Sequence, residues 1–177
     1  MRLSNLKSAI CGTEKLVVED IEIVTLEVPI EDAEGNEGTF REDEWHIKVR
    51  PYKRDARRCP ECGRKCPGYD QQDLRAWRTV DVGTSRCHLH YAPARVRCPE
   101  HGPIVEAVPW ADHKAKLTRA MDEQIAWAMC HLCRSAVREL FRVADVTVGN
   151  ACDRVLRRCV DQDELLEGLR CIGIDEL

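Results

Sequence analysis

Two short turns each contain two metal-binding side chains with two residues between them, and 35 residues lie between the last such side chain of the first turn and the first of the second. The first turn, Cys59–Gly63, reads CPECG, and the second, Cys98–Gly102, reads CPEHG. Proline and glycine favour tight turns, so both side chains of a turn can reach one ion. Four such donors suit a closed, tetrahedral zinc site. We therefore expect a structural Zn²⁺ ion bound by Cys59, Cys62, Cys98 and His101.

Simpler explanations for these cysteines fit less well. Thiols that are merely buried would not need the same turn residues twice, and a redox pair would not be split between distant segments. Further candidate ligands lack a matching turn, and we place them outside the ligand set: Cys66, Cys87, His88 and His90.

The composition makes a metal-stabilised fold physically useful. The 177 residues suffice for one or two small domains, and only 5% of them are aromatic against 33% charged, so the cores must be lean. The eleven cysteines are an odd number, and no signal peptide is visible, which indicates a reducing cytoplasm. No apolar run approaches membrane-spanning length.

The net charge of −4 conceals segregation along the chain. Residues 51–110 have 11 basic and 7 acidic side chains, and residues 111–160 have 9 and 6, whereas both ends are acidic. Local fields of this kind can attract nucleic acid even when the whole chain is acidic. Arg57, Arg58, Arg64 and Lys65 flank the first turn. They are candidates for phosphate contact, or they stabilise the thiolates.

The first hundred residues are expected to be rich in strands. We predict a short helix at 3–10, a half-buried strand at 16–28, and a further strand at 45–52. The acidic segment 31–44 is expected to be a long exposed loop, solvated or acting as a partner-binding tip. Between the two turns we predict strands at 76–82 and 87–96. This pattern indicates a β-rich zinc ribbon rather than the compact finger that reads DNA with a helix.

From residue 117 the pattern becomes helical. Residues 108–111 are expected to form a linker, after which Thr118 caps a helix with an apolar stripe. Cys130 and Cys133 on this helix are expected to be small core residues. A helix at 135–141 capped by Ser135, a break at 143–146 and a helix from Thr147 to Cys159 predict a helix-turn-helix.

The second of these helices has a predicted buried stripe and an open face. The stripe comprises Val148, Ala151, Cys152, Val155, Leu156 and Cys159. The open face comprises Asn150, Asp153, Arg154, Arg157 and Arg158. Asn and Arg side chains suit base edges and phosphates in a major groove. We therefore predict DNA contacts from Thr147, Asn150, Arg154, Arg157 and Arg158; the alternative is an ordinary helical hairpin with a solvated basic face.

These parts, in this order, resemble transposases of the ISL-three family of bacterial insertion sequences. The resemblance rests on residues 57–63, 95–102 and 108–110, on the helix-turn-helix, and on the final apolar run Ile172–Glu176. It implies that the zinc-binding and helix-turn-helix regions precede a ribonuclease-H-like domain, whose Asp-Asp-Glu triad holds two Mg²⁺ ions. Asp175 would be the first triad residue. Because such a site needs several carboxylates, we expect a fragment that recognises DNA without cutting it.

The sequence thus predicts an α+β fold in three parts. These are a β-rich zinc-binding domain at 1–110, with the ribbon at about 53–103, a helix-turn-helix domain at 111–162, and the truncated start of a catalytic domain at 163–177. The expected partner is double-stranded DNA at transposon ends, in the bacterial cytoplasm and nucleoid, with no membrane. The alternative is a protein-interaction module that associates with itself or with full-length transposase and regulates transposition.

Overall fold

The computed structural model describes residues 15–31 and 37–160. The predicted helix at 3–10 and the carboxylate Asp175 lie outside these residues. The chain divides into two compact units, residues 1–121 and 122–177. None of the helices among the described residues is long and apolar enough to cross a membrane.

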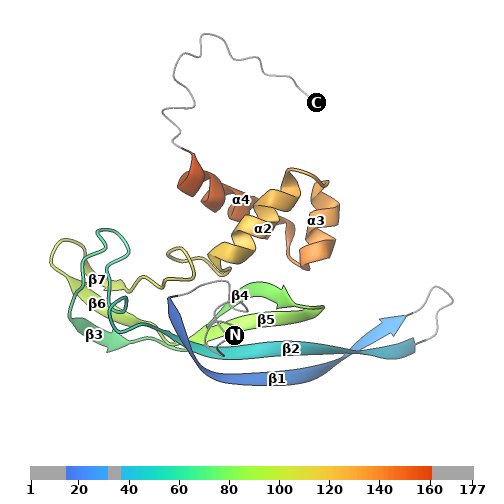
Figure 1. The fold of residues 1–177 in the computed structure, drawn as a ribbon, viewed down its shortest axis with the longest axis horizontal. Coiled ribbons are helices and arrows are strands. Elements are labelled where there is room, and N and C mark those ends of the chain that lie inside the picture. Colours follow the sequence, from blue (N-terminus) through green and yellow to red (C-terminus); the bar gives the residue numbers. More distant parts are fainter. Residues whose placement is uncertain (1–14, 32–36, 161–177) are drawn as a thin grey trace, which may run out of the picture. The chain divides into compact units, whose positions relative to one another are not determined.

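The first unit contains a mixed sheet and a smaller antiparallel sheet (Figure 1). The larger sheet has the order β1-β2-β5-β4, from β1 (Leu16–Glu31), β2 (Glu37–Pro51), β4 (Arg75–Val82) and β5 (Ser85–Tyr91). Neighbouring strands are antiparallel except β2 and β5, which are parallel. The smaller sheet is antiparallel and has the order β3-β6-β7, from β3 (Gly68–Gln71), β6 (Ala94–Cys98) and β7 (Gly102–Val105).

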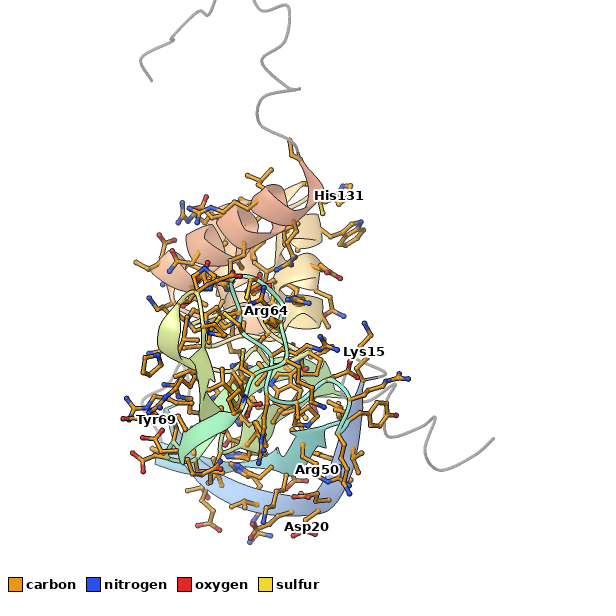
Figure 2. All side chains as sticks on the ribbon, turned by 90° about the vertical axis from the view of Figure 1, so that its left-hand side faces the viewer. Lys15, Asp20, Arg50, Arg64, Tyr69 and His131 are labelled. Carbon is orange, nitrogen blue, oxygen red and sulfur yellow. The ribbon has the colours of Figure 1, made fainter. Side chains whose placement is uncertain are left out.

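The strands β1 and β2 form a hairpin much longer than the sequence predicted. The prediction of a loop at 31–44 is wrong, because residues 37–44 belong to β2 and pair with residues 24–31 of β1. Polar partners across the hairpin support this register: the Thr25 hydroxyl donates to Asp43 over 2.7 Å, and Arg41 lies 3.5 Å from Glu27. Charged side chains such as Asp20 and Arg50 project from the hairpin (Figure 2).

The segment between the zinc turns contributes strands to both sheets. The single strand expected at 87–96 is two strands, because Pro93 cannot donate to a ladder and interrupts the pairing. β5 then pairs with β2 and β4, whereas β6 pairs with β3 and β7. The turn between β4 and β5 needs only Gly83 and Thr84, with Gly83 at a φ of +65°.

The core of the first unit includes the segment that was expected to be a linker. Trp110 is 2% exposed, and its ring meets the rings of Trp77 and Tyr91 edge-on at 5.6 Å between centroids. Residues 108–111 therefore contribute to this core and do not form the predicted linker. The predicted domain boundary after residue 110 lies within this packed segment. The remaining buried members of this core are Leu16, Ile47, Val49, Cys87, Leu89, Val108 and Ala111.

The helical part begins with α2 (Arg119–Met129), followed by α3 (Arg134–Phe141) and α4 (Asp145–Cys159). Thr118 caps α2 as predicted, since its hydroxyl accepts a hydrogen bond from the Met121 amide at 3.3 Å. The other two predicted caps are wrong. Cys133 precedes α3 and Ala144 precedes α4, so Ser135 and Thr147 lie inside the first turns.

Candidate metal centre and nucleic-acid interface

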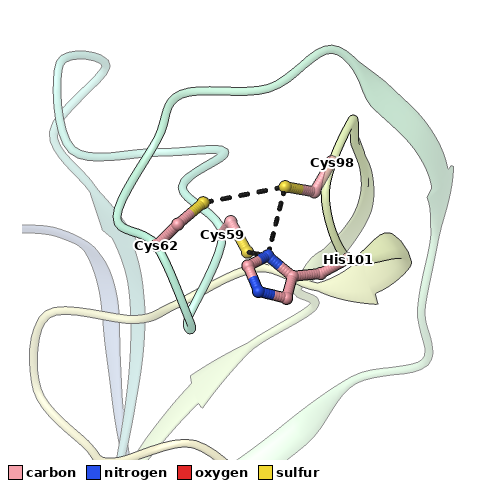
Figure 3. Close-up of side chains that lie close together, drawn as sticks. All are labelled: Cys59, Cys62, Cys98 and His101. Carbon is pink, nitrogen blue, oxygen red and sulfur yellow. Dashed lines mark hydrogen bonds between the residues drawn. The ribbon is translucent and has the colours of Figure 1, made fainter.

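The four side chains of the two turns converge on one point (Figure 3). Their donor atoms, Sγ of Cys59, Cys62 and Cys98 and one ring nitrogen of His101, all lie within 4.8 Å of one another. The sulfur atoms of Cys62 and Cys98 are 3.7 Å apart. Nδ1 of His101 lies 3.6 Å from the sulfur of Cys59 and 3.5 Å from that of Cys98.

These separations match the edges of a tetrahedron around zinc. With Zn–S bonds of about 2.3 Å and Zn–N bonds of about 2.0–2.1 Å, adjacent ligand atoms lie about 3.8 Å apart for two sulfurs and about 3.6 Å apart for sulfur and nitrogen. The four donors therefore fit a closed site that leaves no coordination position open. They would hold the two turns together, which is a structural role.

Each turn is shaped by its own backbone hydrogen bonds. In the first turn the Cys59 amide donates to the Arg64 carbonyl over 2.9 Å, and Gly63 adopts a φ of +68°. The second turn joins β6 to β7, where Cys98 pairs with Gly102, also at a φ of +68°. A side chain at either glycine would strain this left-handed conformation. The backbone hydrogen bonds and the glycines thus set the positions of the ligands.

Backbone amides favour the thiolate form of Cys98. Burial raises the pKa of this thiol, but hydrogen bonds from the backbone and side chain of His101 and from the Glu100 backbone outweigh it. The pKa of Cys98 consequently falls to about 6. A thiolate is the form that binds zinc, so the turn prepares this ligand.

Cys66 lies outside the group of four donors. It is 5% exposed, packs with Cys59, Cys98 and Val96, and directs its thiol to the Arg64 carbonyl at 3.4 Å. It thus supports the ligands by packing, and burial raises the pKa of its thiol. None of the nine cysteines in the described residues forms a disulfide.

The basic residues around the first turn have structural contacts. The Arg58 guanidinium donates to the carbonyls of Gly63 at 2.9 Å and Arg54 at 3.2 Å. Arg64 pairs with Glu100 at 2.7 Å, and Lys65 donates to the Lys53 carbonyl at 2.9 Å. These bonds lie at the surface, so the same side chains still present positive charge to solvent.

Glu106 is a buried residue that sequence reasoning missed. It is 3% exposed, and its carboxylate accepts hydrogen bonds from the amides of Arg57 at 2.5 Å and Ala94 at 2.8 Å. It also accepts one from the Tyr91 hydroxyl at 2.9 Å. Glu106 thus connects the entry of the first zinc turn to β5 and to the start of β6. No local pattern marks it, because all three donors are distant in sequence.

The second unit has the helix-turn-helix arrangement. α3 ends at Arg142, which takes a left-handed φ of +52° with its amide bonded to the last turn, and α4 starts three residues later. Arg134, at the start of α3, lies 2.8 Å from the Asp145 carboxylate at the start of α4. The apolar side chains buried in this unit come from each helix: Ile125, Ala128, Val137, Val148 and Ala151.

Arg154 and Arg158 do not lie on an open face as predicted. Arg154 donates two hydrogen bonds, at 2.8 and 2.6 Å, to the carboxylate of Asp122, which is fully buried on α2. Arg158 approaches the same carboxylate at 3.7 Å. A buried charge requires such partners, so this face of α4 holds the unit together.

The exposed face of α4 is formed by Val146, Asn150, Asp153 and Arg157. Their spacing of four, three and four residues aligns them along one side of the helix. Arg157 is 75% exposed and lies 4.0 Å from Asp153. Thr147 is half-buried beside this face. Leu156 and Cys159, predicted to be buried, are exposed, as are Cys130 and Cys133, which both follow the end of α2.

Comparisons with known proteins match both parts of the chain. Residues 55–101 match a family described as the zinc-finger of transposase IS204/IS1001/IS1096/IS1165, and residues 106–156 match the helix-turn-helix domain of transposase family ISL3. The transposase for insertion sequence element IS1557, from Mycobacterium tuberculosis strains CDC 1551 and H37Rv, is 40% identical over 179 residues. The match covers this whole chain but only 38% of the relative. No solved structure matches the chain.

Proposed function

Because the chain contains the zinc-finger and helix-turn-helix regions of ISL3-family transposases, we propose that it recognises the terminal inverted repeats of an insertion sequence. The chain spans 38% of the length of these relatives. In this proposal the chain recognises DNA in the bacterial nucleoid. Strand transfer would belong to the part of the relatives that this chain does not cover. The observation that carries the proposal is the exposed face of α4 in a helix-turn-helix.

α4 has the features of a recognition helix. In helix-turn-helix proteins the second helix enters the major groove, and residues in its N-terminal half reach base edges. Asn150 lies there and suits the N6 and N7 atoms of adenine, while the exposed Arg157 suits guanine or a phosphate. Because Arg154 and Arg158 bind Asp122, the reading surface we propose is Val146, Thr147, Asn150, Asp153 and Arg157.

Zinc would stabilise the recognition region rather than act in chemistry. Four protein donors fill a tetrahedral zinc site, so no position remains for water or substrate. Arg57, Arg58, Arg64 and Lys65 would then lie on a rigid ribbon and contribute phosphate contacts. Such contacts add affinity and salt dependence but no sequence preference.

A binding titration tests the proposal. The full chain, loaded with zinc, is titrated against a labelled duplex taken from the end of its own insertion sequence. Arg157→Ala and Asn150→Ala should each weaken binding by about 1–3 kcal/mol, because each removes a base or phosphate contact. Arg41→Ala is the matched control, since Arg41 is equally exposed on the β1–β2 hairpin.

The possible outcomes distinguish DNA binding by the chain from DNA contact by α4. Failure of the unaltered chain to bind the duplex would contradict DNA recognition itself. Binding that is unchanged in both α4 variants would show that another element contacts the DNA. Loss of affinity in Arg41→Ala equal to that in Arg157→Ala would indicate general charge attraction rather than contact by α4.

A further inference from the structure

A second group of metal-binding side chains lies on the larger sheet of the first unit. Glu44 and His46 on β2 lie beside His88 and His90 on β5, where the two strands run parallel. His46 pairs with His88 in the register, and Glu44 and His90 are two residues away on the same face. The sequence separation of more than 40 residues hides this group from sequence analysis.

Three of these side chains have donor atoms close enough to share one ion. Glu44, His46 and His88 each offer one atom, and these atoms lie within 4.8 Å of one another. The Glu44 oxygen Oε2 is 3.6 Å from Nε2 of His46 and 4.0 Å from Nδ1 of His88. Ligand atoms on a zinc ion with bonds of about 2.0–2.1 Å lie about 3.4 Å apart, so small side-chain rotations complete the geometry.

His90 supports His46 from outside this group. Nδ1 of His46 and Nε2 of His90 are 2.9 Å apart, so one of them donates a hydrogen bond to the other. If Nε2 of His46 binds metal, its proton lies on Nδ1, which then donates to His90. Metal-binding histidines commonly have such an outer partner, which fixes the tautomer and the ring orientation.

The Glu44 carboxylate is held by an arginine on one side and faces the histidines on the other. Arg86 lies 3.6 Å from the Glu44 oxygen Oε1, which leaves Oε2 directed at the histidines. Neutral imidazole is the form that binds a metal.

We propose that Glu44, His46 and His88 bind a second divalent transition metal, with zinc as the best fit, and that His90 positions His46. Imidazole and carboxylate donors suit zinc, and three protein ligands leave one position for water. This site is separate from the Cys/His centre and does not depend on DNA recognition. It is expected to exchange its ion more readily than the closed four-ligand centre.

Metal content of the full chain tests the site. After saturation with zinc and gel filtration, His88→Ala should contain one equivalent less than the unaltered protein. Glu44→Gln, which keeps size and hydrogen-bonding capacity, should lose the same equivalent. His113→Ala is the control, because His113 belongs to neither group of donors, and it should lose none. Full zinc content in both His88→Ala and Glu44→Gln would overturn the proposal.

Cobalt distinguishes the two sites spectroscopically. Co²⁺ bound by thiolates gives intense charge-transfer absorption, whereas a histidine and carboxylate site gives only weaker ligand-field bands. The charge-transfer absorption should saturate first, and ligand-field absorption should continue to rise through a further equivalent. His88→Ala should keep the first signal, which shows an intact Cys/His centre, and lose the second rise. A second rise of unchanged size in His88→Ala would contradict the assignment.

Discussion

At the scale of single residues, Glu106 is a buried carboxylate that joins several parts of the first unit. Its carboxylate accepts three hydrogen bonds, from two backbone amides and from Tyr91. Burial and this neighbouring carboxylate raise the pKa of the Tyr91 hydroxyl, which therefore stays protonated and donates. The two amides belong to Arg57 and Ala94, so one side chain fixes the position of the first zinc turn relative to the strands.

Glu106→Ala should therefore destabilise the first unit strongly. The change leaves three donors without their acceptor, and each buried unpaired group costs about 1–3 kcal/mol. We expect the free energy of unfolding to fall by at least about 3 kcal/mol, measured by urea titration of the zinc-loaded protein with tryptophan fluorescence. Glu19→Ala, which removes an exposed partner of Arg50, should cost less than about 1 kcal/mol. Equal effects would contradict the role of Glu106.

The stabilisation that the Asp70–Arg95 ion pair contributes should depend on pH. Arg95 donates a hydrogen bond from Nε to Oδ1 of Asp70 at 2.8 Å and a second from Nη2 to Oδ2, which lowers the pKa of this carboxyl. A carboxyl whose folded pKa is depressed stabilises the fold above its unfolded pKa. The contribution is lost as the pH falls through the folded pKa.

An NMR titration of the Asp70 carboxyl should therefore give a pKa below the usual range for Asp. In Arg95→Gln the pKa of Asp70 should rise toward that range, because the charged donor is gone. Arg97→Gln is the control, since Arg97 contacts the Tyr69 ring rather than Asp70. An unchanged pKa of Asp70 in Arg95→Gln would show that the pair does not cause the shift.

At the scale of elements, the ion pair between α2 and α4 holds α4 against α2. Asp122→Ala leaves the guanidinium groups of Arg154 and Arg158 without their buried carboxylate. Breaking a buried pair in this way costs about 3–5 kcal/mol. We expect the free energy of unfolding of the second unit to fall by this amount. Hydrogen exchange of the α4 amides should become correspondingly faster. Asp153→Ala, which removes an exposed partner of Arg157, should leave exchange nearly unchanged.

Local signals predicted some elements well. The two Pro–Gly turns gave the four converging ligands, and helical periodicity gave α2, α3 and α4 to within a few residues. Long-range pairing was not predictable in the same way. The parallel contact of β2 with β5 and the extension of the β1–β2 hairpin depend on cross-strand partners such as Thr25 and Asp43. The acidic composition of the hairpin instead resembled that of a loop.

Burial of polar and aromatic side chains was the other limit of sequence reasoning. Trp110 follows a proline in a short segment with no periodicity, so nothing local places it in the core. Arg154 and Arg158 match the pattern of a DNA-reading face. Only the position of α2 shows that they bind Asp122 instead. The pattern of charges on one helix therefore cannot distinguish a reading face from a buried ion pair.

At the scale of the whole molecule, the first unit contains the four converging Cys/His donors and the second contains the α3–α4 helix pair. Basic side chains outnumber acidic ones in residues 51–160, which contain both the Cys/His donors and the helix pair, although the whole chain has a net charge of −4. The relatives that contain this region are transposases more than twice its length. Recognition of DNA ends is the function that we propose for this chain.

The most direct test of this account is a specificity measurement. The zinc-loaded full chain is titrated at about 0.15 M salt against its own terminal repeat and against a scrambled duplex of the same length and composition. We expect the affinity for the terminal repeat to exceed the affinity for the scrambled duplex by about 10³-fold or more, as for specific DNA-binding proteins. Equal affinity for the two duplexes would contradict the claim that this chain recognises the ends of its element.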